Sequence, residues 1–166
     1  MNLFMPYYSI AASVRSLDDV RLNKQILECY QILRVALGES EGYKNHPIVK
    51  HYSQYPGFVA RYGWQCCGEY NFRTNKHHKY EDYFYKTRWS PANEVELLYA
   101  EYSKNDPRCI RTNKIKEVCT LYQRKLCNKW DQDSRKQRNA RWTCREVPDF
   151  YSQHRNVIEQ MKLMNY

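Results

Sequence analysis

The stretch that decides the fold is residues 17–38, LDDVRLNKQILECYQILRVALG. At about 100° per residue, one side of a helix over this stretch carries Leu22, Ile26, Cys29, Tyr30, Leu33 and Leu37. The opposite arc carries Arg21, Lys24, Gln25, Glu28 and Gln31. Ser16 is suited to cap this helix, acidic residues follow in its first turn, and Gly38 is suited to end it. We therefore predict a long helix over about residues 17–37.

The polar arc of this helix places one carboxylate, Glu28, among two cations and two amides. Such a carboxylate can manage positive charge on a substrate and exchange protons, provided that the neighbouring cations hold it ionised. The alternative interpretation is a helix face that simply contacts solvent, which is the commoner reason for a polar arc.

The rest of the chain predicts a compact, irregularly packed, all-α domain. Residues 1–166 contain no repeat, low-complexity tract or linker, so we expect one domain. Pro56 and Gly57 are expected to interrupt the helical pattern, and residues 75–89 are left unassigned. Further helices are expected over residues 10–15, 47–54, 58–72 and 114–130, from Ser90 and Pro91 onward, and from Pro148 onward.

Composition narrows the classes of protein to consider. The chain has seven cysteines, an odd number, and no apparent secretory signal, so we expect reduced thiols in an intracellular, cytoplasmic protein. No apolar run is long enough to cross a membrane. The cysteine and histidine spacings match no paired zinc-ligand pattern, so we predict neither a metal nor a cofactor. The abundance of tyrosine, asparagine and lysine suggests a phage or other viral source.

The net charge of +9 is concentrated in one segment. Residues 108–145 hold 12 Lys and Arg against three acidic residues, whereas the remaining residues hold 15 of each sign. Cations neutralise phosphates, and aromatic rings between them can stack on exposed bases, so the pattern favours a nucleic-acid partner over a merely solvated surface. The candidate nucleic-acid contacts are Lys114, Arg124, Lys125, Lys129, Trp130, Arg138, Arg141, Trp142 and Arg145.

About the first 75 residues resemble the pyrimidine-dimer DNA glycosylase family, the small all-helical enzymes of the endonuclease V type. The resemblance is carried by residues 1–4, by the sequence Tyr43-Lys44-Asn45-His46-Pro47, and by a set of positions on the predicted helix. Those positions are Leu17, Asp18, Arg21, Leu22, Lys24, Gln25, Glu28, Gln31, Ile32 and Leu33.

The resemblance implies a particular chemistry. In characterised members, the α-amino group at the start of the chain attacks the sugar C1′ of a damaged nucleotide, and a glutamate on the first long helix assists. Met1 and Glu28 occupy the matching positions. Free α-amines have pKa values of about 7.7 to 8.0, so a fraction is unprotonated and nucleophilic at neutral pH. The resemblance thus implies a DNA glycosylase and AP-lyase-like enzyme acting on damaged or modified DNA.

The sequence departs from the characterised phage enzyme at several positions. Asn2 is too large for efficient removal of the initiator methionine, so the free amine is expected on Met1. Leu27 and Gln31 stand where that enzyme has two arginines, and Arg21 replaces a histidine.

The remaining candidates for substrate binding are Asn2, Arg21, Lys24, Gln31, Asn45 and His46. Arg21 and Lys24 could hold a phosphate, while Asn45 and His46 could contact a sugar or base. Each has a structural alternative: Arg21 could pair with Asp18 or Gln25, and Asn45 could cap the helix that begins at Pro47.

Two other functions remain open from the sequence. One is an inactive relative that binds or sequesters a small nucleotide or cyclic nucleotide signal, such as a defence second messenger of the host that a phage gains by sequestering. The other is a DNA-binding protein without catalysis that depends on residues 108–145.

Overall fold

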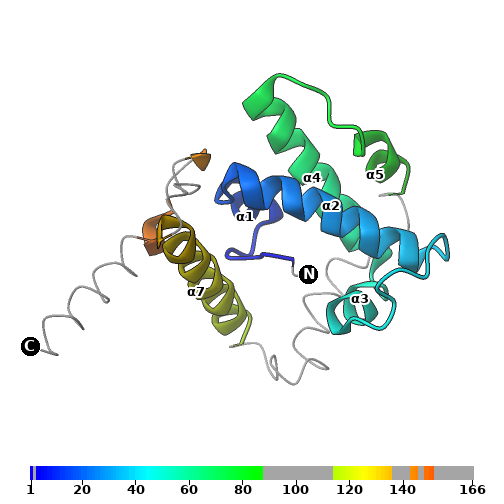
Figure 1. The fold of residues 1–166 in the computed structure, drawn as a ribbon, viewed down its shortest axis with the longest axis horizontal. Coiled ribbons are helices and arrows are strands. Elements are labelled where there is room, and N and C mark those ends of the chain that lie inside the picture. The colour runs from blue at the N-terminus through cyan, green and yellow to red at the C-terminus, as the bar shows by residue number, and fades with distance from the viewer. Residues whose placement is uncertain (2, 88–113, 136–142, 146–147, 152–166) are drawn as a thin grey trace, which may run out of the picture.

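The computed structural model describes residues 1, 3–87, 114–135, 143–145 and 148–151, and every regular element among them is a helix (Figure 1). This confirms the predicted all-α class. The helices are α1 (Ile10–Arg15), α2 (Asp19–Ala36), α3 (Pro47–Tyr52), α4 (Pro56–Thr74), α5 (Glu81–Thr87) and α7 (Lys114–Arg135).

The long helix α2 begins and ends at side chains and backbone groups that suit those roles. Asp18 is its N-cap, with a carboxylate oxygen that accepts a hydrogen bond from the Arg21 backbone N–H at 2.9 Å. Ser16 ends α1 instead, so the sequence-based choice of cap was wrong. At the other end Gly38 has a φ of 73°, and the Glu39 N–H donates to the Arg34 carbonyl at 2.8 Å. This is the left-handed helix ending that glycine favours.

Two sequence-based boundaries need correction. Pro56 was expected to interrupt a helix, but it is the first residue of α4, where its missing N–H leaves no hydrogen bond unmade. Within the unassigned residues 75–89, residues 81–87 form α5. The helix predicted from Ser90 and Pro91 lies outside the described residues. Of the last predicted helix, which was expected to begin at Pro148, only residues 148–151 are described, and residues 149–151 are helical.

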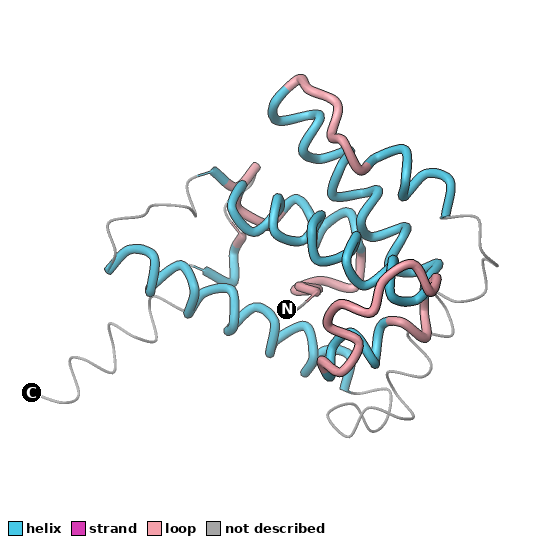
Figure 2. Tube along the Cα trace, turned by 45° about the vertical axis from the view of Figure 1, so that its right-hand side comes forward, coloured by secondary structure: helices cyan, strands magenta, loops and turns pink. Residues whose placement is uncertain are grey.

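Helices α2 and α4 pack across one another, and α5 packs against α4 and also contacts α2 (Figures 1 and 2). Their contact buries Ile26, Cys29 and Leu33 of α2 together with Tyr62 and Cys66 of α4. Apolar burial of this extent is the main stabilising contribution in a domain of this size.

The N-terminal segment, residues 3–6, is buried between α2 and α7 (Figures 1 and 2). On the α7 side, Gln123 Nε2 donates to the Pro6 carbonyl at 2.8 Å, and the Tyr122 ring lies 6.1 Å from the Phe4 ring in an edge-to-face arrangement. Helix α7 therefore covers the segment that leads to the N-terminus.

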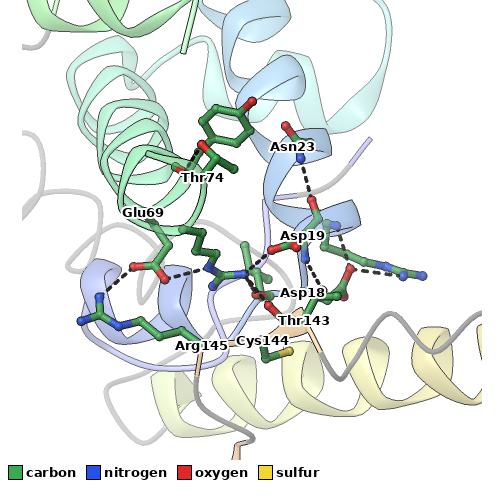
Figure 3. Close-up of polar contacts among 12 residues, drawn as sticks. Asp18, Asp19, Asn23, Glu69, Thr74, Thr143, Cys144 and Arg145 are labelled. Atoms are coloured by element: carbon green, nitrogen blue, oxygen red, sulfur yellow. Dashed lines mark hydrogen bonds and ion pairs between the residues drawn. The ribbon is translucent and has the colours of Figure 1, made fainter. Parts of the chain in front are cut away.

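A network of arginine and carboxylate contacts joins residues 143–145 to α2 and α4 (Figure 3). The Arg73 guanidinium donates to the Asp19 carboxylate at 2.9 Å and to the Thr143 carbonyl at 3.0 Å. The buried Glu69 carboxylate accepts from Arg73 at 2.9 Å and from Arg145 at 3.2 Å. No helix among the described residues has the length and apolar character needed to span a membrane.

Candidate active site

The structure places the start of the chain next to the central carboxylate of α2. The Met1 amino nitrogen lies 3.9 Å from Glu28 Oε1. Glu28 is only 5% exposed and Gln25 only 1% exposed, although both belong to the polar arc. The alternative of a solvated helix face is therefore wrong for these two residues. Their side chains face the N-terminal segment.

Gln25 joins the N-terminal segment to Glu28. Its Oε1 accepts a hydrogen bond from the Phe4 N–H at 2.8 Å, and its Nε2 donates to Glu28 Oε2 at 3.0 Å. From α4, the Tyr62 hydroxyl donates to the Phe4 carbonyl at 2.6 Å. Both backbone polar groups of Phe4 are thus satisfied by side chains of helices that the core holds in place.

The electrostatics of this site are set by few groups. Lys24 Nζ lies 3.9 Å from Glu28 Oε1, and the Lys24 side chain is 63% exposed. Burial raises the pKa of the Cys29 thiol and of the Tyr62 hydroxyl well above their ordinary values, with the Glu28 charge adding to both shifts. Cys29 and Tyr62 therefore stay protonated at neutral pH. The site combines an amine, a carboxylate and an exposed ammonium group.

Arg21 contacts two carboxylates in the structure, whereas the sequence suggested that it could hold a phosphate. Its guanidinium forms an ion pair with Asp133 of α7 and lies 3.5 Å from Asp18 Oδ1. The structural alternative, pairing with Asp18, is thus observed, and Asp133 is a partner that the local sequence did not indicate. A phosphate contact for Arg21 stays a prediction.

The loop before α3 corrects another expectation. His46, not Asn45, caps α3, because its Nδ1 accepts from the Ile48 N–H at 3.1 Å. Asn45 is exposed, and Gln31 is partly buried one turn beyond Glu28 on α2. Asn2 lies outside the described residues. No contact with a substrate is tested for any of them.

Comparison with known families assigns the part of the chain that carries this site. Residues 1–82 match the family described as pyrimidine dimer DNA glycosylase. The match covers 82 of the 166 residues, and over this part the chain is similar to that family. No curated protein and no solved structure matched the chain. The family points to a DNA-glycosylase-like function and to DNA as the substrate.

The matched residues 1–82 end within α5, and they contain every residue named above for the amine and carboxylate site. Of these, Gln25 and Tyr62 were not among the sequence-based candidates. Gln25 had a signal, because it lies three residues before Glu28 on the same arc. Tyr62 had none, since only the packing of α4 against the N-terminal segment brings its hydroxyl to Phe4.

The basic segment beyond the glycosylase-family match is only partly what the sequence predicted. Trp130 is 1% exposed, its Nε1 donates to Asp18 Oδ2 at 2.6 Å, and its ring stacks on Phe150. It is a core residue, and the prediction that its ring is available to stack on bases was wrong.

The cations of this segment differ in their contacts and in their exposure to solvent. Arg145 donates to the Glu69 carboxylate and lies over the Phe72 ring, with 3.8 Å from its guanidinium carbon to the ring centroid. Arg124 is exposed, and Lys125 and Lys129 are partly exposed on α7. The Lys114 side chain, Arg138, Arg141 and Trp142 lie outside the described residues. Within the described part of the chain, no group of three His, Cys, Asp or Glu side chains is arranged to hold a metal ion.

Proposed function

We propose that this protein is a DNA glycosylase with AP-lyase activity that acts on damaged or modified DNA through the Met1 amine and Glu28. The observation that carries the proposal is the 3.9 Å separation of the Met1 nitrogen and Glu28 Oε1, within the family-matched residues. An amine beside a buried carboxylate is the pair that Schiff-base chemistry at a sugar carbon requires.

The reaction follows from these two groups. The neutral amine attacks C1′, and the electron pair of the glycosidic bond leaves with the base, which takes up a proton. The nitrogen then gives up a proton and the ring oxygen O4′ takes one up as the C1′–O4′ bond breaks, which leaves a protonated Schiff base at C1′. Loss of a C2′ proton with departure of the 3′ phosphate cleaves the strand. Glu28 accepts and returns protons in these steps and offsets the positive charge that develops on the sugar.

The surrounding cations would hold the DNA backbone. Lys24, whose side chain is exposed, has its ammonium group 3.9 Å from Glu28 Oε1. Further positive charge comes from outside the family match, from Arg124, Lys125 and Lys129 of α7. Phosphate contacts of this kind give affinity that falls steeply with salt and carries no base specificity. Recognition of the damaged nucleotide would fall to Asn2, Gln31, Asn45 and His46.

The test is borohydride trapping with ultraviolet-irradiated, abasic-site-containing and undamaged duplexes, using protein whose free Met1 amine is verified by intact mass. We expect a covalent adduct on at least one damaged duplex and none on undamaged DNA. Glu28→Gln keeps nearly the same shape but cannot accept a proton, so it should bind DNA as wild type does. Its trapping should slow by about 10²- to 10⁴-fold.

Peptide mapping of the adduct supplies the control for the nucleophile. Lys24 carries a second amine at the same 3.9 Å distance from Glu28 Oε1. We expect the adduct on Met1 in the wild type and on Met1 again in Lys24→Arg. An adduct on Lys24 would transfer the nucleophile to that residue, and no adduct on any duplex would overturn the proposed function. Calorimetry with mononucleotides and cyclic nucleotides would then test the nucleotide-binding alternative.

A further inference from the structure

We infer that Gln25 is the positioning residue of this site: its carboxamide holds the Met1 amine and the Glu28 carboxylate in one fixed relation. The inference rests on the proposed function and assigns a role that the family match does not give. It is carried by the two hydrogen bonds of one buried side chain, to the Phe4 N–H at 2.8 Å and to Glu28 Oε2 at 3.0 Å.

The carboxamide can be placed in only one way at this position. The Phe4 N–H requires an acceptor, which only Oε1 supplies, and the Glu28 carboxylate requires a donor, which only Nε2 supplies. The same side chain therefore defines the position of the backbone three residues from the amine and the orientation of the carboxylate. Glu28 Oε2 is directed to the amide, and Oε1 is left to face Met1 and Lys24.

Tyr62 completes the support from a second helix. Its hydroxyl donates to the Phe4 carbonyl at 2.6 Å, and its oxygen also lies 3.3 Å from Gln25 Oε1. A hydroxyl has one proton, so the shorter contact to the carbonyl takes it. Tyr62 thus holds the N-terminal segment through a hydrogen bond of its own, so a substitution at Tyr62 loosens that segment while the Gln25 amide still donates to Glu28 Oε2.

A carboxylate at position 25 could not replace the amide in both of its hydrogen bonds. It could still accept from Phe4, but it would present a second negative oxygen to Glu28, so the two carboxyl groups would share a proton. Among the described residues, the ionisable groups near Glu28 include the Met1 amine and Lys24, with the Cys29 thiol and the Tyr62 hydroxyl contributing to its surroundings. None of these groups would remove the repulsion in such a variant, whereas the neutral amide of the wild type avoids it.

The experiment compares wild type with Gln25→Glu, Gln25→Met and Tyr62→Phe by single-turnover trapping on an abasic-site duplex across pH. Gln54→Glu is the matched control, because it makes the same change at an exposed glutamine on the surface after α3. We expect both Gln25 variants to trap about tenfold more slowly or worse with DNA affinity unchanged. In Gln25→Glu the acid limb of the profile should also move to higher pH, whereas in Gln25→Met it should stay in place.

A second readout does not depend on DNA chemistry. Reductive methylation of the Met1 amine, measured by peptide mass spectrometry against exposed Lys50 and Lys76, reports how firmly the segment is held. Methylation of Met1 should be roughly three- to tenfold faster in Gln25→Met and in Tyr62→Phe than in wild type, because each loses a hydrogen bond to Phe4. Gln54→Glu should match wild type.

The outcomes separate this inference from the proposed function. If wild type traps DNA and the Gln25 variants trap as Gln54→Glu does, with an unmoved acid limb, the positioning role is overturned while the enzyme stands. If wild type does not trap, the proposed function fails, and the methylation rates alone decide whether Gln25 holds the amine. Should Gln25→Met not fold, Gln25→Glu and Tyr62→Phe carry the comparison.

Discussion

Asp18 is a fully buried carboxylate whose oxygens face different parts of the fold. Oδ1 accepts from the Arg21 N–H and caps α2, while Oδ2 accepts from Trp130 Nε1 of α7 at 2.6 Å. A buried carboxylate is tolerated only when such donors replace its lost hydration. At the scale of one residue, Asp18 therefore determines both where α2 begins and where α7 rests.

Replacing Asp18 by alanine should destabilise the protein strongly. The change removes the N-cap and the carboxylate that accepts from the buried Trp130 N–H, so we expect the free energy of unfolding to fall by about 2–4 kcal/mol. Urea unfolding followed by circular dichroism measures it. Ser9→Ala is the control, because Ser9 caps α1 at an exposed position and should cost only about 1 kcal/mol. Equal losses in the two variants would contradict the role given to the Trp130 contact.

At the scale of elements, the contact between α4 and α5 depends on a missing side chain. A Cβ on Gly63 would lie 2.5 Å from the ring of Phe84, which is fully buried on α5. Gly68, on the same helix, has open space where its Cβ would be. The two glycines thus differ in packing while sharing the helical conformation.

Alanine substitution at these glycines should have opposite effects on stability. Gly63→Ala forces the Phe84 ring to move and should lower the free energy of unfolding by about 1–3 kcal/mol. Gly68→Ala reduces the conformational freedom of the unfolded chain and should raise it by about 0.5–1 kcal/mol. Thermal and urea unfolding of both variants give the comparison. A Gly63→Ala protein as stable as Gly68→Ala would show that α5 does not pack on α4 as described.

At the scale of the whole molecule, the family match and the hydrophobic core have different limits. The match ends at residue 82, but the core continues through Tyr122, Leu126 and Trp130 of α7. Gln123 also contacts the N-terminal segment that carries Met1. The residues outside the family match therefore pack against the segment that leads to Met1.

The ion pair between Arg21 of α2 and Asp133 of α7 allows this docking to be measured. Both side chains are largely buried, so a double-mutant cycle with alanine at each position should give a coupling of about 1–3 kcal/mol. The exposed pair of Lys44 and Glu41 is the control and should couple by less than about 1 kcal/mol. A coupling for Arg21 and Asp133 no larger than the control would leave Arg21 free for the phosphate contact predicted from sequence.

Local pattern determined much of this protein without the structure. The period of apolar residues and Gly38 at its end predicted α2, and Pro47 marked the first residue of α3. The matched N-terminal residues pointed to Met1 and Glu28 as a pair, and the structure brings them to 3.9 Å. These features follow from the sequence because each depends on side chains a few residues apart or on a family pattern.

Only the tertiary structure decided how the polar residues are used. Gln25 and Glu28 have the spacing of a solvated face, yet the N-terminal segment covers them. Trp130 has the neighbours of a base-stacking ring, yet it lies in the core against Asp18, 112 positions away along the chain. Periodicity states which side chains share a face, but the partner of that face is set by contacts between distant segments. The burial and the hydrogen bonds of a side chain therefore depend on that partner as much as on the residue itself.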